Sequence, residues 1–441
     1  MIRNQGATPW RLRPGHGTWG PVGFMKNKDL QRVAAARFIS RAGGEAAFFV
    51  GIWGKAAFEF RATPAQLAIL MAALSVSSIV GTVLSGVLVD RYDARRVLVF
   101  AEAFFVPVAL AFMLPGGMVQ LTLLCALLGF FGAPVMTAAA SFAPFIADET
   151  TSMETVNAWI EGASSSSFVI GPAIGAVLYA VVGLNAIWAF DALTSLVAAF
   201  LVWRVTLRPA ERVEPRGRSH PFAELREGLR YTYTHRALRY PILMGTAIWL
   251  GFGAFGALEP LYYRDVLHTG VATLGWMNTL FGAGLVGGAW LYSRLPARMG
   301  SARGLAIVAA VVGLGALLYV GTNLLVVAAV GLTIWGVVIG VGDVLLRTLI
   351  QGSSPDELVG RIAGASQMHR QAGELLPLAV APALAAAFGV QAVLIGGSLV
   401  ITAIAALTFS EARAVDRLPR LRPTRAIGRL TAEDEPVSPN P

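Results

Sequence analysis

The chain has 441 residues, of which 55% are hydrophobic and 14% are charged, and its mean hydropathy is +0.63. A soluble globular domain carries about 25% charged residues, so this composition excludes that class and indicates a polytopic membrane protein. The net charge of +9 does not indicate nucleic-acid binding, because the basic residues gather in the tails and in alternate loops. The single cysteine, Cys125, excludes disulfides, thiolate metal sites and redox pairs within the chain.

Two terminal segments differ from the apolar remainder. Residues 1–29 are rich in Gly, Pro and Arg and lack the apolar core of a signal peptide, so we interpret them as a disordered cytoplasmic tail. Translation from Met25 instead of Met1 is an open alternative. Residues 411–441 are basic and then acidic, with several prolines, and are interpreted as a second disordered cytoplasmic tail.

Between the tails, apolar segments recur, each close to the ~20 residues that a membrane-spanning helix requires. The twelve expected crossings are residues 33–58, 67–89, 97–114, 121–146, 156–182, 186–205, 240–263, 274–295, 304–320, 325–350, 362–388 and 392–409. An even number of crossings puts both termini on one side. The excess of arginine in alternate loops predicts that this side is the cytoplasm.

The crossings divide into two halves of six. The N-terminal half is residues 30–206 and the C-terminal half is residues 239–410, joined by a cytoplasmic linker over residues 207–238. In the linker, Phe222, Leu225 and Leu229 recur at helical spacing, which predicts an amphipathic helix on the membrane surface. An unstructured linker is an equally good interpretation of its first part.

The loop between the second and third crossings is the most specific motif. It reads Gly-x-Leu-x-Asp-Arg-x-x-x-Arg-Arg and runs from Gly86 to Arg96. This pattern resembles the signature loop of the major facilitator superfamily of secondary transporters. Its Asp-Arg-Tyr-Asp-Ala-Arg-Arg form is more similar to the macrolide-efflux and siderophore-exporter branch, and it carries Asp93 where a glycine is usual.

The resemblance implies a contact, here called the cytoplasmic latch, that joins the two halves near the start of the eleventh helix. Glycine permits close helix packing, and the aspartate can accept hydrogen bonds from a helix start or pair with an arginine. The residues of the predicted latch are Gly86, Asp90, Arg91, Arg95, Arg96 and Arg361. A solvated loop that only sets the topology is the alternative interpretation.

The fifth crossing contains a second motif, with Gly171, Pro172 and Gly175, that resembles the motif of the family's antiporters. Proline removes a backbone hydrogen bond and glycine lets a helix press against its neighbour, although both residues are ordinary in spanning helices. In a departure from many proton-coupled exporters, the fourth crossing has no arginine. Any proton coupling must therefore use other groups.

Ionisable residues inside the crossings are functional candidates by default, because burying them in a membrane costs several kcal/mol. Opposite charges four residues apart can neutralise each other on one helix face. Such pairs are Arg41 with Glu45, Lys55 with Glu59, Asp343 with Arg347, and Arg370 with Glu374. No such partner exists for Glu102, Glu161, Asp191 and Glu259; of these, Glu102 is interpreted as part of the latch and Glu161 as hydrated near a membrane face.

In the resembled fold the first, fourth, seventh and tenth helices line the cavity. That arrangement favours Glu45 and Glu259 as proton carriers, with Asp343 and Arg347 nearby, whereas Asp191 is interpreted as mainly structural. A carboxyl group in a partly dry cavity can bind a proton near neutral pH and release it when the cavity opens to the other side. Proton and substrate would then compete for one charged site.

A bulky amphipathic substrate would require apolar and aromatic walls. The candidates are Phe49, Trp53, Phe131, Met136, Trp249, Phe252 and Trp335, although most such residues face lipid or a packed neighbour. Enzyme signatures such as a phosphate-binding loop or His-Glu-x-x-His are absent from the sequence, which also suggests no cofactor and no metal.

The sequence therefore predicts an all-α integral membrane protein with twelve transmembrane helices, in the plasma membrane, and not an enzyme. Its expected function is secondary active export of drug-like or amphipathic molecules by alternating access and proton antiport, as a monomer. The expected partners are a small-molecule substrate, protons and the lipid bilayer. The alternatives are export of one endogenous metabolite or siderophore, an uncoupled facilitator, and a receptor or scaffold on the same fold.

Overall fold

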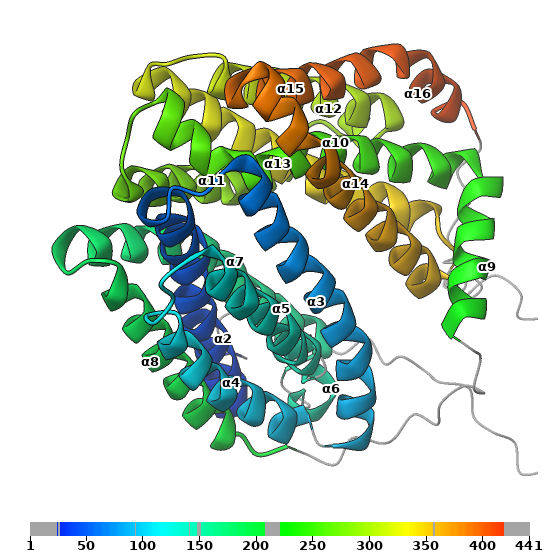
Figure 1. The fold of residues 1–441 in the computed structure, drawn as a ribbon. Helices are drawn as coiled ribbons and strands as arrows, with labels where there is room; N and C mark the ends of the chain where they lie inside the picture. Colours follow the sequence, from blue (N-terminus) through cyan, green and yellow to red (C-terminus); the bar gives the residue numbers. More distant parts are fainter. Residues whose placement is uncertain are drawn as a thin grey trace, which may run out of the picture. The chain divides into compact units, whose positions relative to one another are not determined.

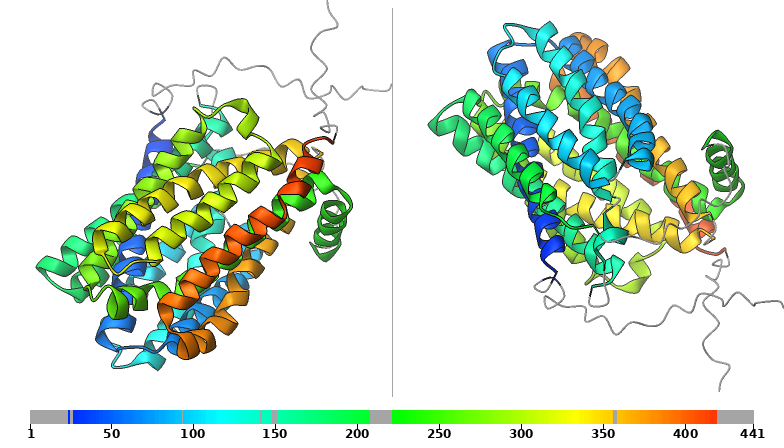
Figure 2. Two further views of the ribbon diagram at one scale, coloured as in Figure 1. Left: turned by 90° about the horizontal axis from the view of Figure 1, so that it is seen from above. Right: turned by 90° about the horizontal axis from the view of Figure 1, so that it is seen from below.

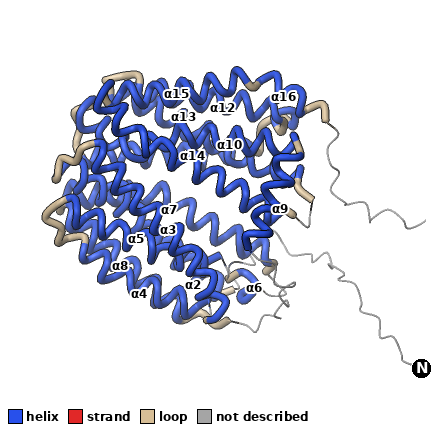
Figure 3. Tube along the Cα trace, turned by 45° about the vertical axis from the view of Figure 1, so that its right-hand side comes forward, coloured by secondary structure: helices blue, strands red, loops and turns tan. Residues whose placement is uncertain are grey.

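The computed structural model describes residues 24, 27–92, 94–140, 142–147, 151–207, 221–355 and 358–418. Across these residues the chain is helical and contains no strand (Figure 3). It forms two compact units. The N-terminal unit comprises Met1–Ala62, Ile69–Val213 and Gly270–Thr279, and the C-terminal unit comprises Thr63–Ala68, Glu214–Thr269 and Leu280–Pro441.

The helices of the N-terminal unit follow the predicted apolar segments closely (Figure 1). They are α2 (Lys28–Ala46), which continues through two π-helical segments (Ala47–Ile52 and Gly54–Glu59), α3 (Pro64–Arg91), α4 (Ala94–Ala111), α5 (Met118–Ala140), the short α6 (Ala143–Ile146), α7 (Met153–Val181) and α8 (Leu184–Trp203). Helix α2 packs against α7 and α8, and α4 packs against α5 and α8.

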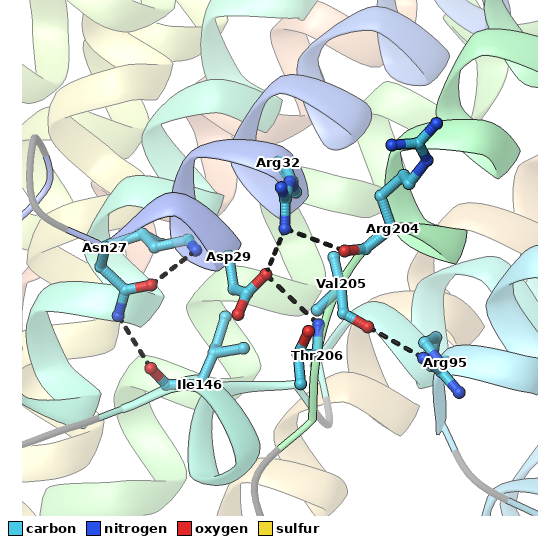
Figure 4. Close-up of polar contacts among 9 residues, drawn as sticks. Asn27, Asp29, Arg32, Arg95, Ile146, Arg204, Val205 and Thr206 are labelled. Carbon is cyan, nitrogen blue, oxygen red and sulfur yellow. Dashed lines mark hydrogen bonds and ion pairs between the residues drawn. The ribbon is translucent and has the colours of Figure 1, made fainter.

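Polar contacts fasten the start of α2 to its neighbours (Figure 4). Asn27 caps α2, because its side-chain oxygen accepts a hydrogen bond from the Leu30 amide at 2.9 Å, and its amide nitrogen donates to the Ile146 carbonyl at 2.9 Å. Arg32 donates to Asp29 and to the Arg204 carbonyl, both at 2.9 Å. A capping residue satisfies an otherwise unbonded helix amide, so these contacts fix where α2 begins relative to the end of α8.

The C-terminal unit repeats the pattern of long helices lying side by side (Figure 1, Figure 2). Its elements are α9 (Pro221–Thr234), α10 (Arg236–Leu261) with a π-helical segment (Tyr262–Val266), the part of α11 (Val271–Tyr292) that follows Thr279, a 3₁₀ turn (Ala297–Met299), α12 (Ala302–Val320), α13 (Leu325–Ser353), α14 (Val359–Phe388), α15 (Val390–Leu407) and α16 (Phe409–Val415). Helix α10 packs against α14 and α15, and α12 packs against α13 and α15.

Nine helices in the described part of the chain are long and apolar enough to cross a membrane. Three predicted crossings fall on helices that do not reach this standard, namely α2, α4 and α11. Charged residues interrupt α2 and α4, and glycines with Asn278 lower the hydropathy of α11. The count of twelve crossings and the side of the termini remain predictions.

The outward faces of the helices are strongly apolar. Leu114, Phe100, Phe388 and Leu407 are each at least 71% exposed, and many other large apolar side chains are exposed with them. A soluble monomer rarely exposes contiguous apolar patches of this kind, which are typical of surfaces that face lipid. The surface is therefore that of a membrane protein.

The predicted linker helix exists as α9, but it does not lie free. It packs against α14, and Glu227 forms an ion pair with Arg361 at the start of that helix. The side chains of Phe222 and Leu225 lie outside the described part, so the predicted apolar face of this helix is not tested.

Candidate functional site

A pocket opens in the C-terminal unit between α10, α12 and α13. Trp249 and Phe252 of α10 form its aromatic wall, and Asp343 of α13 is the one charged side chain among its lining residues. An apolar pocket with a single convergent charge suits an amphipathic ligand whose polar group is placed by that charge. Three residues singled out from the sequence thus meet at one site.

The aromatic wall is supported from behind. Trp335 is 2% exposed and stacks on Phe252, with their ring centroids 4.7 Å apart. Phe255 and Phe281 also pack on Trp335, at 4.8 Å and 5.3 Å between centroids. Trp335 does not line this pocket but holds the ring of Phe252 in position, and its predicted contact with substrate stays a prediction.

Further charges lie around the pocket. The guanidinium of Arg370 on α14 lies 4.7 Å from the ring centroid of Trp249, which is a cation–π distance. Arg370 and Arg347 both interact electrostatically with Asp343. Two of the ion pairs predicted from a spacing of four residues do not form among the described residues. They are Asp343 with Arg347 and Arg370 with Glu374, so these groups are not neutralised as predicted.

Glu259 forms the most ordered polar cluster of the C-terminal unit. The hydroxyl of Tyr319 on α12 donates to the Glu259 carboxylate at 2.7 Å, and it lies 2.7 Å from the hydroxyl of Tyr263. One hydroxyl carries one proton, so Tyr263 must donate to Tyr319 when Tyr319 donates to Glu259. Both tyrosines are fully buried. The result is a chain of hydroxyl groups that ends on a carboxylate.

Helix spacing connects this cluster to the pocket. Trp249, Phe252, Phe255 and Glu259 follow one another at intervals of three or four residues along α10, which places them on one face. The π-helical segment begins at Tyr262, whose hydroxyl shares its one proton between the carbonyl oxygens of Tyr319 and Thr322, at 2.9 Å and 2.6 Å. Such segments are frequent at functional sites. Here the segment brings Tyr262 and Tyr263 onto the end of α12.

Tyr263 and Tyr319 were not among the site residues predicted from the sequence. Tyrosines inside apolar helices are a usable signal, because a buried phenol group nearly always needs a hydrogen-bond partner. Tyr319 lies on a different helix from Glu259 and Tyr263, and its contacts with them cannot be read from spacing along the chain.

In the N-terminal unit, Glu45 forms the expected ion pair with Arg41, at 2.7 Å. The predicted antiporter motif lies against it: a Cβ atom at Gly171 would be 2.6 Å from the Glu45 Cβ and 2.7 Å from the Ala42 carbonyl oxygen. Gly175 meets Val50 in the same way, at 2.8 Å. Small residues at these positions therefore let α7 press against α2 next to the ion pair.

Lys55 does not pair with Glu59. Its ammonium group is buried and donates to the carbonyls of Phe112 and Met113 at 3.0 Å and 3.3 Å, while Glu59 is exposed. These carbonyls lie just past the C-terminal end of α4, where backbone oxygens lack helical partners and a cation is favourable. Lys55 therefore has a structural role.

The remaining cavity candidates contact other side chains of the N-terminal unit. Phe49 packs edge-on against Phe168, Trp53 is buried near Phe48, and Phe131 lies 4.1 Å from Phe104 between ring centroids. Met136 is 50% exposed, and its sulfur accepts hydrogen bonds from Arg37 and Arg41 at 3.4 Å and 3.3 Å. Their contact with substrate remains a prediction.

The predicted latch is only partly described. Helix α3 extends to Arg91, so Gly86, Asp90 and Arg91 occupy its last turns, but their side chains and the whole of Asp93 lie outside the described residues. Arg95 donates to the Val205 carbonyl at 3.0 Å (Figure 4), and Arg96 is exposed. The contact of Asp90 with the other half remains a prediction.

Two other observations limit the chemistry of the site. Within the described ranges, no group of three or more His, Cys, Asp or Glu side chains could hold a metal ion. Asp191 is 3% exposed, lies on α8, interacts electrostatically with Glu102 of α4 and is not among the residues that line the aromatic pocket. Asp191 thus belongs to a separate group of buried charges.

Comparison with known proteins agrees with these features. A sequence profile of the Major Facilitator Superfamily matches residues 33–377. The multidrug efflux pump Tap of Mycobacterium tuberculosis is 28% identical over 383 residues, which cover 82% of this chain and 89% of that protein. Macrolide efflux protein A of Enterococcus faecalis is 27% identical over 213 residues, which cover 46% of this chain and 64% of that protein.

Solved structures share the fold. The nucleoside transporter NupG superimposes with a TM-score of 0.65 at 11% identity, covering 89% of this chain and 100% of that one. A bacterial homologue of the iron transporter ferroportin, in an inward-facing state, gives a TM-score of 0.66 at 15% identity, covering 87% and 98%. At such identities the likeness concerns the fold alone.

Proposed function

This chain belongs to the Major Facilitator Superfamily, and from that premise we propose that it exports drug-like or amphipathic molecules from the cytoplasm in exchange for protons. The family and the transporter relatives identify it as a multi-pass membrane transporter rather than an enzyme. Its location in the plasma membrane, twelve crossings, cytoplasmic termini and action as a monomer by alternating access are part of the proposal.

The observation that carries the proposal is the continuous face of α10. It presents Trp249 and Phe252 to the pocket and, two turns further on, Glu259 to the Tyr319 hydroxyl. An aromatic surface next to a carboxyl group is the arrangement that an exchanger of protons for lipophilic cations requires. The names of the two relatives, a multidrug efflux pump and a macrolide efflux protein, support the same substrate class.

In this mechanism Glu259 exchanges one proton per cycle. When the carboxylate is ionised, the Tyr319 hydroxyl stabilises it by a charge-assisted hydrogen bond, and the Tyr263 hydroxyl behind it supplies the next link for proton transfer. Asp343 in the pocket wall attracts the cationic part of a substrate, and the rings of Trp249 and Phe252 contact its apolar part. Proton binding and substrate binding then oppose each other, so the inward proton gradient drives export.

Proteoliposomes with a trapped pH-sensitive dye test this proposal. A lipophilic cation, a macrolide and a siderophore are added in turn under an imposed proton gradient, with wild type, Glu259→Gln and, as matched control, the exposed Glu59→Gln. We expect substrate-dependent proton flux in wild type and in the control, and none above protein-free liposomes in Glu259→Gln. Substrate movement without proton flux in wild type would contradict antiport and leave an uncoupled facilitator.

A further inference from the structure

Three charged side chains lie buried between helices of the N-terminal unit, in a group that we call the buried triad. They are Arg37 of α2, Glu102 of α4 and Asp191 of α8, which are 4%, 2% and 3% exposed. Helix α8 packs against both α2 and α4, so the triad lies where these three helices meet. None of the three lines the aromatic pocket of the C-terminal unit.

Some polar atoms of the buried triad lack hydrogen-bond partners among the described residues. Glu102 accepts a hydrogen bond from Ser40 at 3.0 Å and another from Ser195. The Asp191 carboxylate has neither a hydrogen bond nor an ion pair to any described residue. Arg37 donates to the Met136 sulfur at 3.4 Å, but its Nε has no partner in the same part of the chain. Buried polar groups are normally satisfied, so these atoms indicate a missing ligand.

The charges around the triad do not balance. From α2 it is faced by Arg41 and Glu45, which neutralise each other in their 2.7 Å ion pair. Helix α5 carries no charged residue, and α7 contributes Glu161, which interacts electrostatically with Arg37 but is exposed and not buried with the triad. What remains is one positive charge, on Arg37, against two negative charges, on Glu102 and Asp191. A buried net charge is unfavourable, so the triad requires one further positive charge.

We propose that Glu102 and Asp191 together bind one exchangeable proton, at a site separate from the aromatic pocket. A proton supplies the missing charge without a coordination shell, and the described residues contain no group of ligands that could hold a metal ion. The two carboxyl groups interact electrostatically, so they titrate as a pair and not as independent sites. The role of this proton in transport rests on the proposed proton exchange, whereas its binding does not.

The position of Asp191 couples this proton to helix packing. A Cβ atom at Gly43 of α2 would lie 2.9 Å from Asp191 Oδ1 and would overlap the hydroxyl of Thr194, so the α2 backbone touches the carboxyl group directly. Ionisation of both carboxyl groups would place a net charge in this contact. Loss of the proton therefore weakens the packing of α8 on α2, and α2 is the helix that also carries the Arg41–Glu45 pair and contacts Gly171.

Infrared spectroscopy of the purified full-length protein counts neutral carboxyl groups through their carbonyl band and tests the proposal. At neutral pH we expect Asp191→Asn to lose one carboxyl equivalent relative to wild type and Glu102→Gln to lose one. The double variant should also lose only one carboxyl equivalent relative to wild type. The wild-type pair holds one proton in total, and after either single change the remaining carboxylate is ionised and balances Arg37. Arg37→Gln should gain one equivalent. The exposed Glu59→Gln is the control and should lose none.

These counts separate the possible arrangements. A loss of two equivalents in the double variant would show two independent neutral carboxyl groups, and a loss of none would show two ionised ones; either result overturns the proposal. A wild-type band that appears only when sodium is replaced by choline would also overturn it, because the pair would then bind sodium. The changes at Asp191 and Glu102 are isosteric, and a thermal unfolding midpoint for each variant verifies folding.

The result is distinguishable from that of the transport assay. If the variants show the expected carboxyl counts but proteoliposomes show no proton exchange with any probe, then the buried proton site is supported and the proposed antiport is wrong. If proton exchange occurs and the counts do not hold, then the antiport stands with Glu259 as its carrier and the buried proton site fails.

Discussion

The two units treat buried charge in different ways. In the C-terminal unit, Glu259 receives a hydrogen bond from Tyr319 next to a cluster of aromatic rings, and a pocket opens on the same helix face. In the N-terminal unit, Arg37, Glu102 and Asp191 lie between tightly packed helices. The C-terminal unit thus has a pocket beside its buried carboxyl group, while the N-terminal unit holds its buried charges in the contacts between its own helices.

The largest effect is expected at the tyrosine hydroxyls of the C-terminal unit. Tyr319→Phe removes a hydrogen bond to a carboxylate, worth about 1.5–3 kcal/mol, and should slow proton exchange by roughly tenfold or more. Tyr263→Phe leaves that bond in place and removes only the next hydroxyl, so its effect should be smaller. The measurement is proton flux in proteoliposomes. Equal rates for Tyr319→Phe and wild type would show that the hydroxyl chain has no part in transport.

Packing in the N-terminal unit is tested at Gly171. Gly171→Leu would force side-chain atoms against Glu45 and the Ala42 carbonyl, and overpacking of this kind costs about 1–3 kcal/mol. We expect a lower thermal unfolding midpoint and reduced transport. Gly162→Leu is the control on the same helix, because a side chain there meets open space. Similar midpoints for the two variants would contradict the close approach of α7 to α2.

Substrate contact in the C-terminal unit is tested at Trp249. Trp249→Ala removes part of the pocket wall and the ring under Arg370. The concentration of a lipophilic cation that gives half-maximal transport should rise about tenfold, which corresponds to roughly 1.4 kcal/mol. Trp290→Ala, at a ring that is 61% exposed on α11, should leave it unchanged. A larger rise in this concentration for Trp290→Ala than for Trp249→Ala would show that the substrate does not bind at Trp249.

The smallest effect is expected at the surface of the C-terminal unit, between α10 and α16. Hydrogen bonds from Arg236 at 3.0 Å and 2.5 Å lower the pKa of Glu411 below its ordinary value of 4.5. A carboxyl group whose pKa is lowered by folding stabilises the protein above its ordinary pKa, and this contribution disappears as pH falls through the lowered value. Glu411→Gln should therefore lower the unfolding midpoint slightly at pH 7 and not at all at strongly acidic pH, as scanning fluorimetry would measure.

Much of the fold could be predicted because its signal is local. Apolar segments of spanning length and the signature loop at Gly86 each follow from neighbouring residues, and the family match confirms the resemblance. The Arg41–Glu45 pair was predicted for the same reason, since both residues share one helix face.

The contacts between helices could not be predicted in the same way. Glu259 accepts a hydrogen bond from Tyr319, and Lys55 donates to the carbonyls of Phe112 and Met113. Glu102 interacts electrostatically with Arg37 and Asp191, which lie on two other helices. Each of these contacts depends on how helices far apart in sequence are packed, and a single sequence carries no record of that packing. Spacing identified the charged residues and not their partners.

The proposed mechanism depends on the opposition between substrate binding in the pocket and proton binding at Glu259, and a binding measurement tests this opposition. Purified protein in weakly buffered solution with a pH indicator is mixed with the lipophilic cation tetraphenylphosphonium, while tryptophan fluorescence reports binding. We expect tetraphenylphosphonium binding to release protons in wild type and in the control Glu59→Gln, and to release none in Glu259→Gln. Binding without proton release in wild type, or undiminished release in Glu259→Gln, would contradict the proposed mechanism.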